Sequence, residues 1–209
     1  LRRLDKAQPG TLYQLGRIYV NQQMPRLAFG AFTDALEADR NQTPEQAISV
    51  ANIFVARRAY DEAQDYIERV RESLGNRMDN DQELELLTLE SQIARATGNV
   101  DQAIETLEQI TRRDPLNGRA LLELAGIYTD REEYERAAFL FEAAQQVEDV
   151  ETQALIQHAQ MLVKQRNFRD AVPLLERAQR LDYQASVDRY LQAVQNAART
   201  QELREAAQG

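Results

Sequence analysis

Apolar residues in this chain recur at helical spacing, and the whole arrangement recurs at long range. In residues 118–183 a helix with one apolar face is followed by a short polar turn and a second helix, whose apolar positions are Ala137, Phe141 and Ala144. The same second-helix pattern stands 34 residues later, from Ala171, and 34 residues earlier, from Ala103. A fixed period of this length is typical of helical repeat arrays, in which each repeat buries its apolar face against its neighbours.

This period divides the chain into repeats of two helices. Residues 1–8 are predicted to be the end of a preceding helix. Five repeats follow at 9–42, 43–83, 84–117, 118–151 and 152–185, and residues 186–209 are predicted to form a capping helix with a polar outer face. The predicted fold class is therefore all-α, an α-solenoid of about five antiparallel helix pairs.

One irregularity interrupts the period. The step from Ala28 to Ala63 is 35 residues, whereas the step from Ala63 to Ala103 is 40. We expect the extra residues to lie in an extended loop at 75–81, because insertions in repeat proteins map to loops. A tolerated surface loop and a binding loop both fit this insertion, and the tolerated loop is favoured.

The residues in register resemble the tetratricopeptide repeat family over essentially the whole chain. That family has Leu, Leu-Gly/Ala and Tyr on the first helix, Ala, Phe and Ala on the second, and a closing Pro. Two copies match closely: Leu12, Leu15, Gly16, Tyr19, Ala28, Phe32 and Ala35, and Leu121, Leu124, Ala125, Tyr128, Ala137, Phe141 and Ala144, the latter preceded by Pro115.

Small residues explain the pattern physically, since two helices come closest where their side chains are smallest. On the first helices these residues are Gly16, Ala51, Ser91, Ala125 and Ala159, and on the second they are Ala28, Ala63, Ala103, Ala137 and Ala171. The chain departs from the family pattern in having no Trp, in carrying Glu90 and His158 where Leu is expected, and in lacking most of the closing prolines.

Composition narrows the class of partner and leaves the compartment open. The net charge is −9 and the pI about 4.8, which argues against nucleic acid because phosphate binding needs a basic stripe. No run of 18 apolar residues is present, so no direct membrane insertion is expected in this segment. Without Cys the compartment is not fixed and could be cytoplasmic or periplasmic. Because the chain starts at Leu1, we expect a fragment or a processed chain, with any signal or anchor outside it.

The sequence predicts no catalytic, metal or cofactor site. His158 is the only His, and it stands in register with Leu15 and Leu124, so we expect it to be partly buried and hydrogen-bonded. Zinc usually takes several His or Cys ligands, which this chain lacks, and there is no Gly-rich phosphate loop. The chain is therefore predicted not to be an enzyme.

The resemblance implies a right-handed superhelix whose first helices line a concave groove. Groove positions alternate with packed positions and are mixed apolar and amide in character, which suits an extended peptide or a helix of a partner protein. The predicted groove residues are Tyr13, Arg17, Ile48, Asn52, Gln92, Arg95, Leu122, Ile156 and Gln160. Some family members grip a terminal carboxylate with basic and amide side chains. Asn52 matches one such position here, but Ile48, Glu85 and Leu89 occupy others, which argues against that ligand.

The leading hypothesis is therefore a non-catalytic protein–protein interaction scaffold. The alternative is a regulatory or recruiting segment of a larger enzyme or of a membrane-anchored or envelope assembly protein. A third hypothesis is a homo-oligomer, formed through the groove or through an exposed end of the array.

Overall fold

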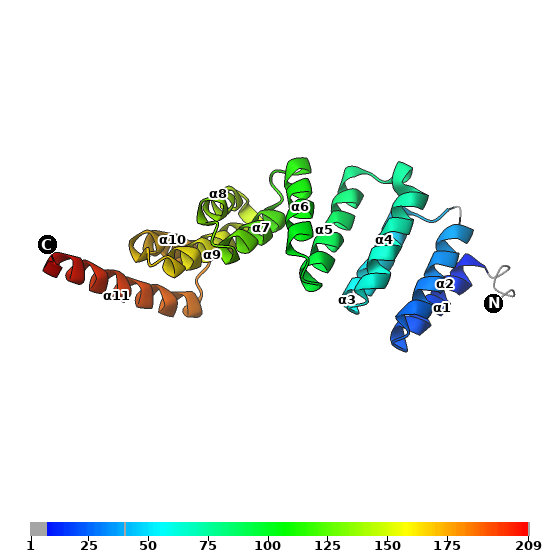
Figure 1. Ribbon diagram of the computed structural model, residues 1–209, viewed down its shortest axis with the longest axis horizontal. Coiled ribbons are helices and arrows are strands. Elements are labelled where there is room, and N and C mark those ends of the chain that lie inside the picture. The colour runs from blue at the N-terminus through cyan, green and yellow to red at the C-terminus, as the bar shows by residue number, and fades with distance from the viewer. Residues whose placement is uncertain (1–7, 40, 209) are drawn as a thin grey trace. The chain divides into compact units, whose positions relative to one another are not determined.

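The computed structural model describes residues 8–39 and 41–208, and these residues are almost entirely helical, with no strand among them. The predicted helix end at residues 1–8 lies outside the described residues, apart from Gln8. In chain order the helices are α1 (Pro9–Asn21), α2 (Pro25–Ala38), α3 (Pro44–Ala56), α4 (Tyr60–Leu74), α5 (Asn80–Ala96), α6 (Val100–Arg113), α7 (Gly118–Asp130), α8 (Tyr134–Ala144), α9 (Glu151–Lys164), α10 (Phe168–Leu181) and α11 (Ala185–Gln208) (Figure 1).

The helices form two compact units, Leu1–Thr106 and Leu107–Gly209, with the boundary inside α6. In the first unit α1 packs on α2 and α3 on α4, and α5 packs against α3 and α4. In the second unit α7 packs on α8 and α9 on α10, and α11 packs on α10. The predicted all-α solenoid of helix pairs is confirmed.

Close approach within each pair is confirmed at the small residues. The five second-helix alanines are all 0% exposed: Ala28, Ala63, Ala103, Ala137 and Ala171. On the first helices Ala51, Ala125 and Ala159 are 0% exposed and Ser91 is 1% exposed. At Gly16 the approach is so tight that an added Cβ would lie 2.6 Å from Cε1 of Phe32.

Phe32 is the centre of the first unit's core. Its ring is 0% exposed and contacts Tyr13, Phe54 and Tyr66 edge-on, at centroid distances of 5.3, 5.8 and 6.5 Å. This geometry is favourable because the positive edge of one ring meets the negative face of another. In the second unit Phe141 is 2% exposed, as its register position predicts.

Each turn within a helix pair has the same backbone. Three residues connect the helices in all five described pairs, and the middle residue has a positive φ: Gln23 58°, Arg58 58°, Gly98 80°, Glu132 62° and Arg166 62°. The N–H that follows each of these residues donates to a carbonyl five residues back, as Met24 does to Tyr19 at 2.9 Å. This is the Schellman arrangement, which satisfies carbonyls at the end of a helix.

The insertion is more ordered than the sequence predicts. A 3₁₀ turn follows α4 at Gly75–Arg77, and α5 already begins at Asn80, so the predicted loop at 75–81 is shorter than expected. The reason is local: the Asp79 side chain accepts from the Gln82 N–H, while the Gln82 side chain accepts from the Asp79 N–H, which forms a capping box. Gln82 also donates to Glu45, and Arg77 donates to the carbonyl of Gln42. These bonds fasten the insertion to the α2–α3 connection, through Gln42, and to the first turn of α3, through Glu45.

The contact between Gly16 and Phe32 generates a stability prediction. We expect Gly16→Ala to destabilise the chain, because overpacking costs about 1–3 kcal/mol and outweighs the roughly 0.5–1 kcal/mol that Ala gains over Gly in a helix. Gly126→Ala is the matched control, since no atom lies within 4 Å of an added Cβ there. Urea unfolding should show a lower midpoint for the first variant and an equal or higher midpoint for the second. Equal shifts in both would contradict the close contact.

Candidate partner-binding surface

The exposed face of the first helices in the first unit begins on α1. Tyr13 is half-buried, because its ring packs on Phe32, and Arg17 is exposed one turn further along the helix. On α3 the two predicted residues differ. Ile48 is only 1% exposed and belongs to the core, so it is not accessible to a partner in this fold. Asn52 is exposed.

Asn52 links α3 to α5 across this face. Its Nδ2 donates to Oε1 of Glu85 at 3.3 Å. On α5, Gln92 is half-buried and Arg95 is exposed. The first unit therefore brings together Tyr13 and Arg17 on α1 and joins Asn52 to α5, which carries Gln92. Glu85 is an additional surface residue that the groove prediction leaves out, and its contact with Asn52 could not be read from the spacing.

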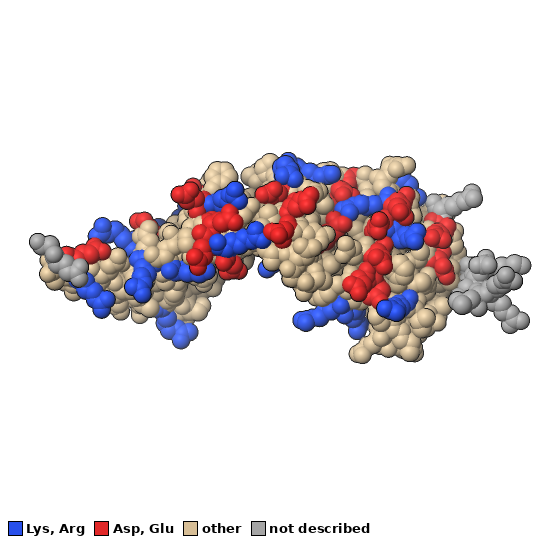
Figure 2. Space-filling view, viewed as in Figure 1, with Lys and Arg blue, Asp and Glu red and all other residues tan. Residues whose placement is uncertain are grey.

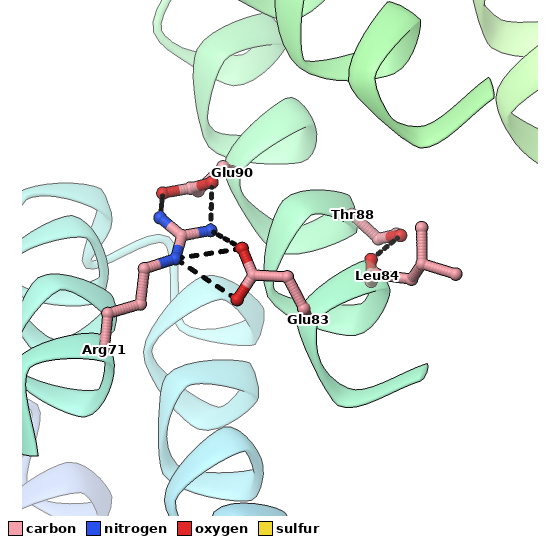
Figure 3. A network of polar contacts seen from close by, with 5 residues as sticks. All are labelled: Arg71, Glu83, Leu84, Thr88 and Glu90. Atoms are coloured by element: carbon pink, nitrogen blue, oxygen red, sulfur yellow. Dashed lines mark hydrogen bonds and ion pairs between the residues drawn. The ribbon is translucent and has the colours of Figure 1, made fainter. Parts of the chain in front are cut away.

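An arginine from α4 links that helix to α5. Arg71 makes a bidentate pair with Glu90, from Nη1 to Oε1 at 2.5 Å and from Nη2 to Oε2 at 2.9 Å. Its Nε donates to Oε1 of Glu83 at 3.2 Å (Figure 3). Two parallel N–H···O bonds between a planar guanidinium and a carboxylate fix geometry as well as charge.

This network explains how α5, the first helix of the third pair, accepts a carboxylate at a position where α1, α3 and α7 carry an apolar residue. Glu90 stands at the position held by Leu15, Val50 and Leu124, and its side chain is 22% exposed. Burial alone would lower the pKa of Arg71, but the hydrogen bonds and charges of Glu90 and Glu83 outweigh burial and raise it. Arg71 thus stays charged and compensates the carboxylate of Glu90.

The second unit presents its own face on α7 and α9. Leu122 is 5% exposed, so like Ile48 it is a packing residue. Ile156 is half-buried against the core cluster that contains Ala159, and Gln160 is exposed. Lys164 donates from Nζ to the carbonyl of Thr129 at 3.2 Å and joins the ends of the two helices.

His158 is buried and contacts a polar side chain, as predicted. It is 7% exposed, its Nδ1 lies 3.0 Å from Nε2 of Gln145, and its ring stacks on Phe141 at 5.5 Å. Burial lowers the pKa of His158 below its ordinary value, and the charge of Glu142 offsets part of that effect. In the part of the chain that the structure describes, no three His, Cys, Asp or Glu side chains are grouped so as to hold a metal ion.

Comparison with known proteins agrees with this arrangement of helices. The tetratricopeptide repeat family profile matches residues 88–149. Residues 88–149 therefore carry tetratricopeptide repeats. A search of curated protein sequences found no match. None of the described helices is long and apolar enough to cross a bilayer.

Similarity to solved structures extends beyond the matched residues. YrrB, described as a TPR protein with an unusual peptide-binding site, aligns over 87% of this chain and 90% of its own, with 14% identity and a TM-score of 0.62. MamA from Desulfovibrio magneticus RS-1 aligns over 83% of this chain and 94% of its own, with 14% identity and a TM-score of 0.62. The pilF protein of Pseudomonas aeruginosa aligns over 91% and 84%, with 15% identity and a TM-score of 0.61. At these identities the likeness establishes the fold, which is a solenoid of helix pairs.

The Arg71 network generates a second stability prediction. Breaking a buried ion pair costs about 3–5 kcal/mol, and because these side chains are 21–33% exposed we expect Arg71→Leu to cost about 1–3 kcal/mol after solvent screening. Arg71→Leu combined with Glu90→Leu should recover part of that loss, since Leu occupies the equivalent position on other first helices. Denaturant unfolding of the two single variants and the double variant gives the coupling energy. A double variant no more stable than Arg71→Leu would show that Glu90 does not depend on Arg71.

His158 generates a pH prediction. Above its ordinary pKa of about 6.5 the ring is neutral in both states and contributes no pH dependence. Below that pH the unfolded chain takes up a proton that the folded chain disfavours, so stability falls, by at most about 1.4 kcal/mol per pH unit. We expect the unfolding free energy of the parent to fall relative to that of His158→Leu between about pH 6.5 and pH 5. Parallel curves for the two proteins would disprove the burial of the ring.

Proposed function

We propose that this chain is a non-catalytic scaffold that binds a peptide or helix of a partner protein on the exposed faces of its first helices. One observation carries the proposal. A single register position on successive first helices, directly after the small residue of each helix pair, holds polar residues or Gly. Its occupants are Arg17, Asn52, Gln92, Gly126 and Gln160. Their side chains are exposed or half-exposed, and the close contact within each helix pair does not involve them.

The chemistry of these residues suits a polypeptide ligand. An amide side chain offers both donors and an acceptor, so it can pair with the N–H and C=O groups of a bound backbone. Arg17 stands one turn from Tyr13, and aromatic and arginine residues are the side chains most enriched at interface hot spots. Because Tyr13 is already fixed by Phe32, it would lose little conformational freedom on binding. Ile48 and Leu122 have no part in the proposal.

The same face would serve a free scaffold or the recruiting segment of a larger enzyme or envelope assembly protein. The identity of the captured protein distinguishes these two forms of the proposal. The exposed residues argue for a partner and do not select between them.

Site-specific photocrosslinking tests the proposal without a known partner. A benzophenone amino acid is introduced in cells at position 17, 52 or 160, one at a time, and at the control positions 64 and 68 on α4, where Gln64 and Glu68 are also exposed. We expect the same protein to be crosslinked from two or more of the first-helix positions and not from the controls. Crosslinks from positions 64 and 68 alone would place the partner on the second helices and refute the proposal.

Binding by the captured protein then gives a quantitative measure. Arg17→Ala and Asn52→Ala should each weaken its affinity several-fold or more, because interface arginines and amides lose their paired groups. The melting temperatures should stay close to that of the parent, since neither side chain is part of the core. Gln64→Ala combined with Glu68→Ala is the control and should bind like the parent.

A further inference from the structure

A small hollow lies in the first unit, away from the register position described above. It has a volume of about 290 Å³ and is formed where α1 ends, where α2 begins, and where the turn after α3 passes. Its lining residues are Val20, Gln23, Pro25, Phe54, Arg57, Arg58 and Ala59. The three-residue turns fix the backbone on both sides of the hollow, because Gln23 and Arg58 are the two left-handed residues of the Schellman motifs.

The hollow has an apolar floor and a basic rim. Val20 and Phe54 are 8% and 1% exposed and belong to the core cluster. Arg57 and Arg58 are exposed, and no acidic residue lines the hollow. Among the described residues, neither guanidinium has an ion pair or a side-chain hydrogen bond.

These two arginines differ from others in the same unit. Arg69 pairs with Glu72, and Arg71 pairs with Glu83 and Glu90. Figure 2 shows basic side chains projecting at the lower edge of this unit. The turns between paired helices lie at that edge in Figure 1. These basic side chains belong to a chain whose net charge is −9. Basic residues at a helix C-terminus can simply offset its negative end. Neither guanidinium donates to a terminal carbonyl of a described helix, so the donors of both are available to a ligand.

We propose that this hollow binds an acidic segment of a partner protein, with one apolar side chain placed over Val20 and Phe54 and the neighbouring carboxylates held by Arg57 and Arg58. The volume is just under the range of about 300–1,000 Å³ that small-molecule pockets occupy, which fits a single anchoring side chain. Guanidinium groups suit carboxylates because they form two parallel hydrogen bonds. Nucleic acid is disfavoured, because two arginines on an acidic chain do not make the basic stripe that a phosphate backbone requires.

The inference names a second contact surface and does not depend on the proposed function. The residues of the hollow are distinct from Arg17, Asn52 and Gln160. A partner that loses affinity with Arg17→Ala or Asn52→Ala, but not with changes at the hollow, would support the proposed function. A partner that loses affinity only with changes at the hollow would support this inference.

The chain itself suggests variants that should fold. The α1–α2 turn has Gln22 and Gln23 where the α3–α4 turn has Arg57 and Arg58, so Arg57→Gln with Arg58→Gln copies a turn already present. Charge reversal is also compatible with the backbone, because Glu132 has the same left-handed conformation, at φ 62°, in the α7–α8 turn. Arg112→Glu with Arg113→Glu is the matched control, since it reverses another exposed pair of adjacent arginines with the same change in net charge.

The test is peptide selection followed by titration. A random dodecapeptide phage library is selected on the full chain and depleted on the chain with Arg57→Glu and Arg58→Glu. We expect the enriched peptides to share an apolar residue flanked by Asp or Glu. A fluorescein-labelled selected peptide should bind the parent at least tenfold more tightly than either the Gln or the Glu double variant. The Arg112/Arg113 control should bind like the parent.

Three outcomes would overturn the inference. The first is a library that yields no binder, or binders without acidic residues. The second is a selected peptide that binds the Gln double variant as tightly as the parent. The third is that the Arg57 and Arg58 double variants lose binding to a labelled oligonucleotide or to phosphatidylserine vesicles but still bind the selected peptide as tightly as the parent. Circular dichroism of each variant should match the parent, so that any loss of binding is not a loss of fold.

Discussion

The close contact between the two helices of each pair is the constraint on which the rest of this structure depends. A second-helix alanine is fully buried in every pair, and the facing first-helix residue is Gly, Ala or Ser. Such small residues leave no room for a side chain in the contact, so the large residues must pack elsewhere. Phe32 shows the limit, because its ring occupies the space that a Cβ at Gly16 would need. The surface left for binding is what remains after this packing is satisfied.

The fold could be predicted from the sequence because this contact leaves a periodic signal. Alanines that recur every 34 or 35 residues can be recognised in the sequence without knowing which residues they contact in the fold. The residues accessible to a partner were harder to predict from the sequence. Ile48 and Leu122 occupy groove register positions, yet both are buried, since register gives the direction of a side chain and not the depth of its surroundings. The partner of Glu90 also lacks a local signal, because Arg71 comes from another helix, 19 residues earlier.

The two proposed surfaces differ in how far the fold fixes their shape before a ligand binds. On the first-helix faces the side chains are mostly polar, and Tyr13 is fixed by its packing on Phe32. At the turns the floor of the hollow is part of the core, so its shape is set before any ligand arrives. A rigid apolar floor would reduce the conformational entropy lost on binding, and the unpaired arginines at the rim would select for negative charge. One repeat architecture can in this way offer both an adaptable contact and a preformed one.

The uniform turns restrict the places where residues can be inserted into such a chain or deleted from it. Within each pair three residues join the helices, and their middle residue is left-handed, so a length change there would misplace both helices. Between pairs the connections vary, from the short 182–184 segment to the longer 75–79 and 145–150 segments, each of which contains a 3₁₀ turn. The helical hairpin is therefore the unit that can be duplicated, deleted or exchanged. New termini or a fused domain should be accepted at connections such as 114–117 and 182–184, and rejected inside the hairpins.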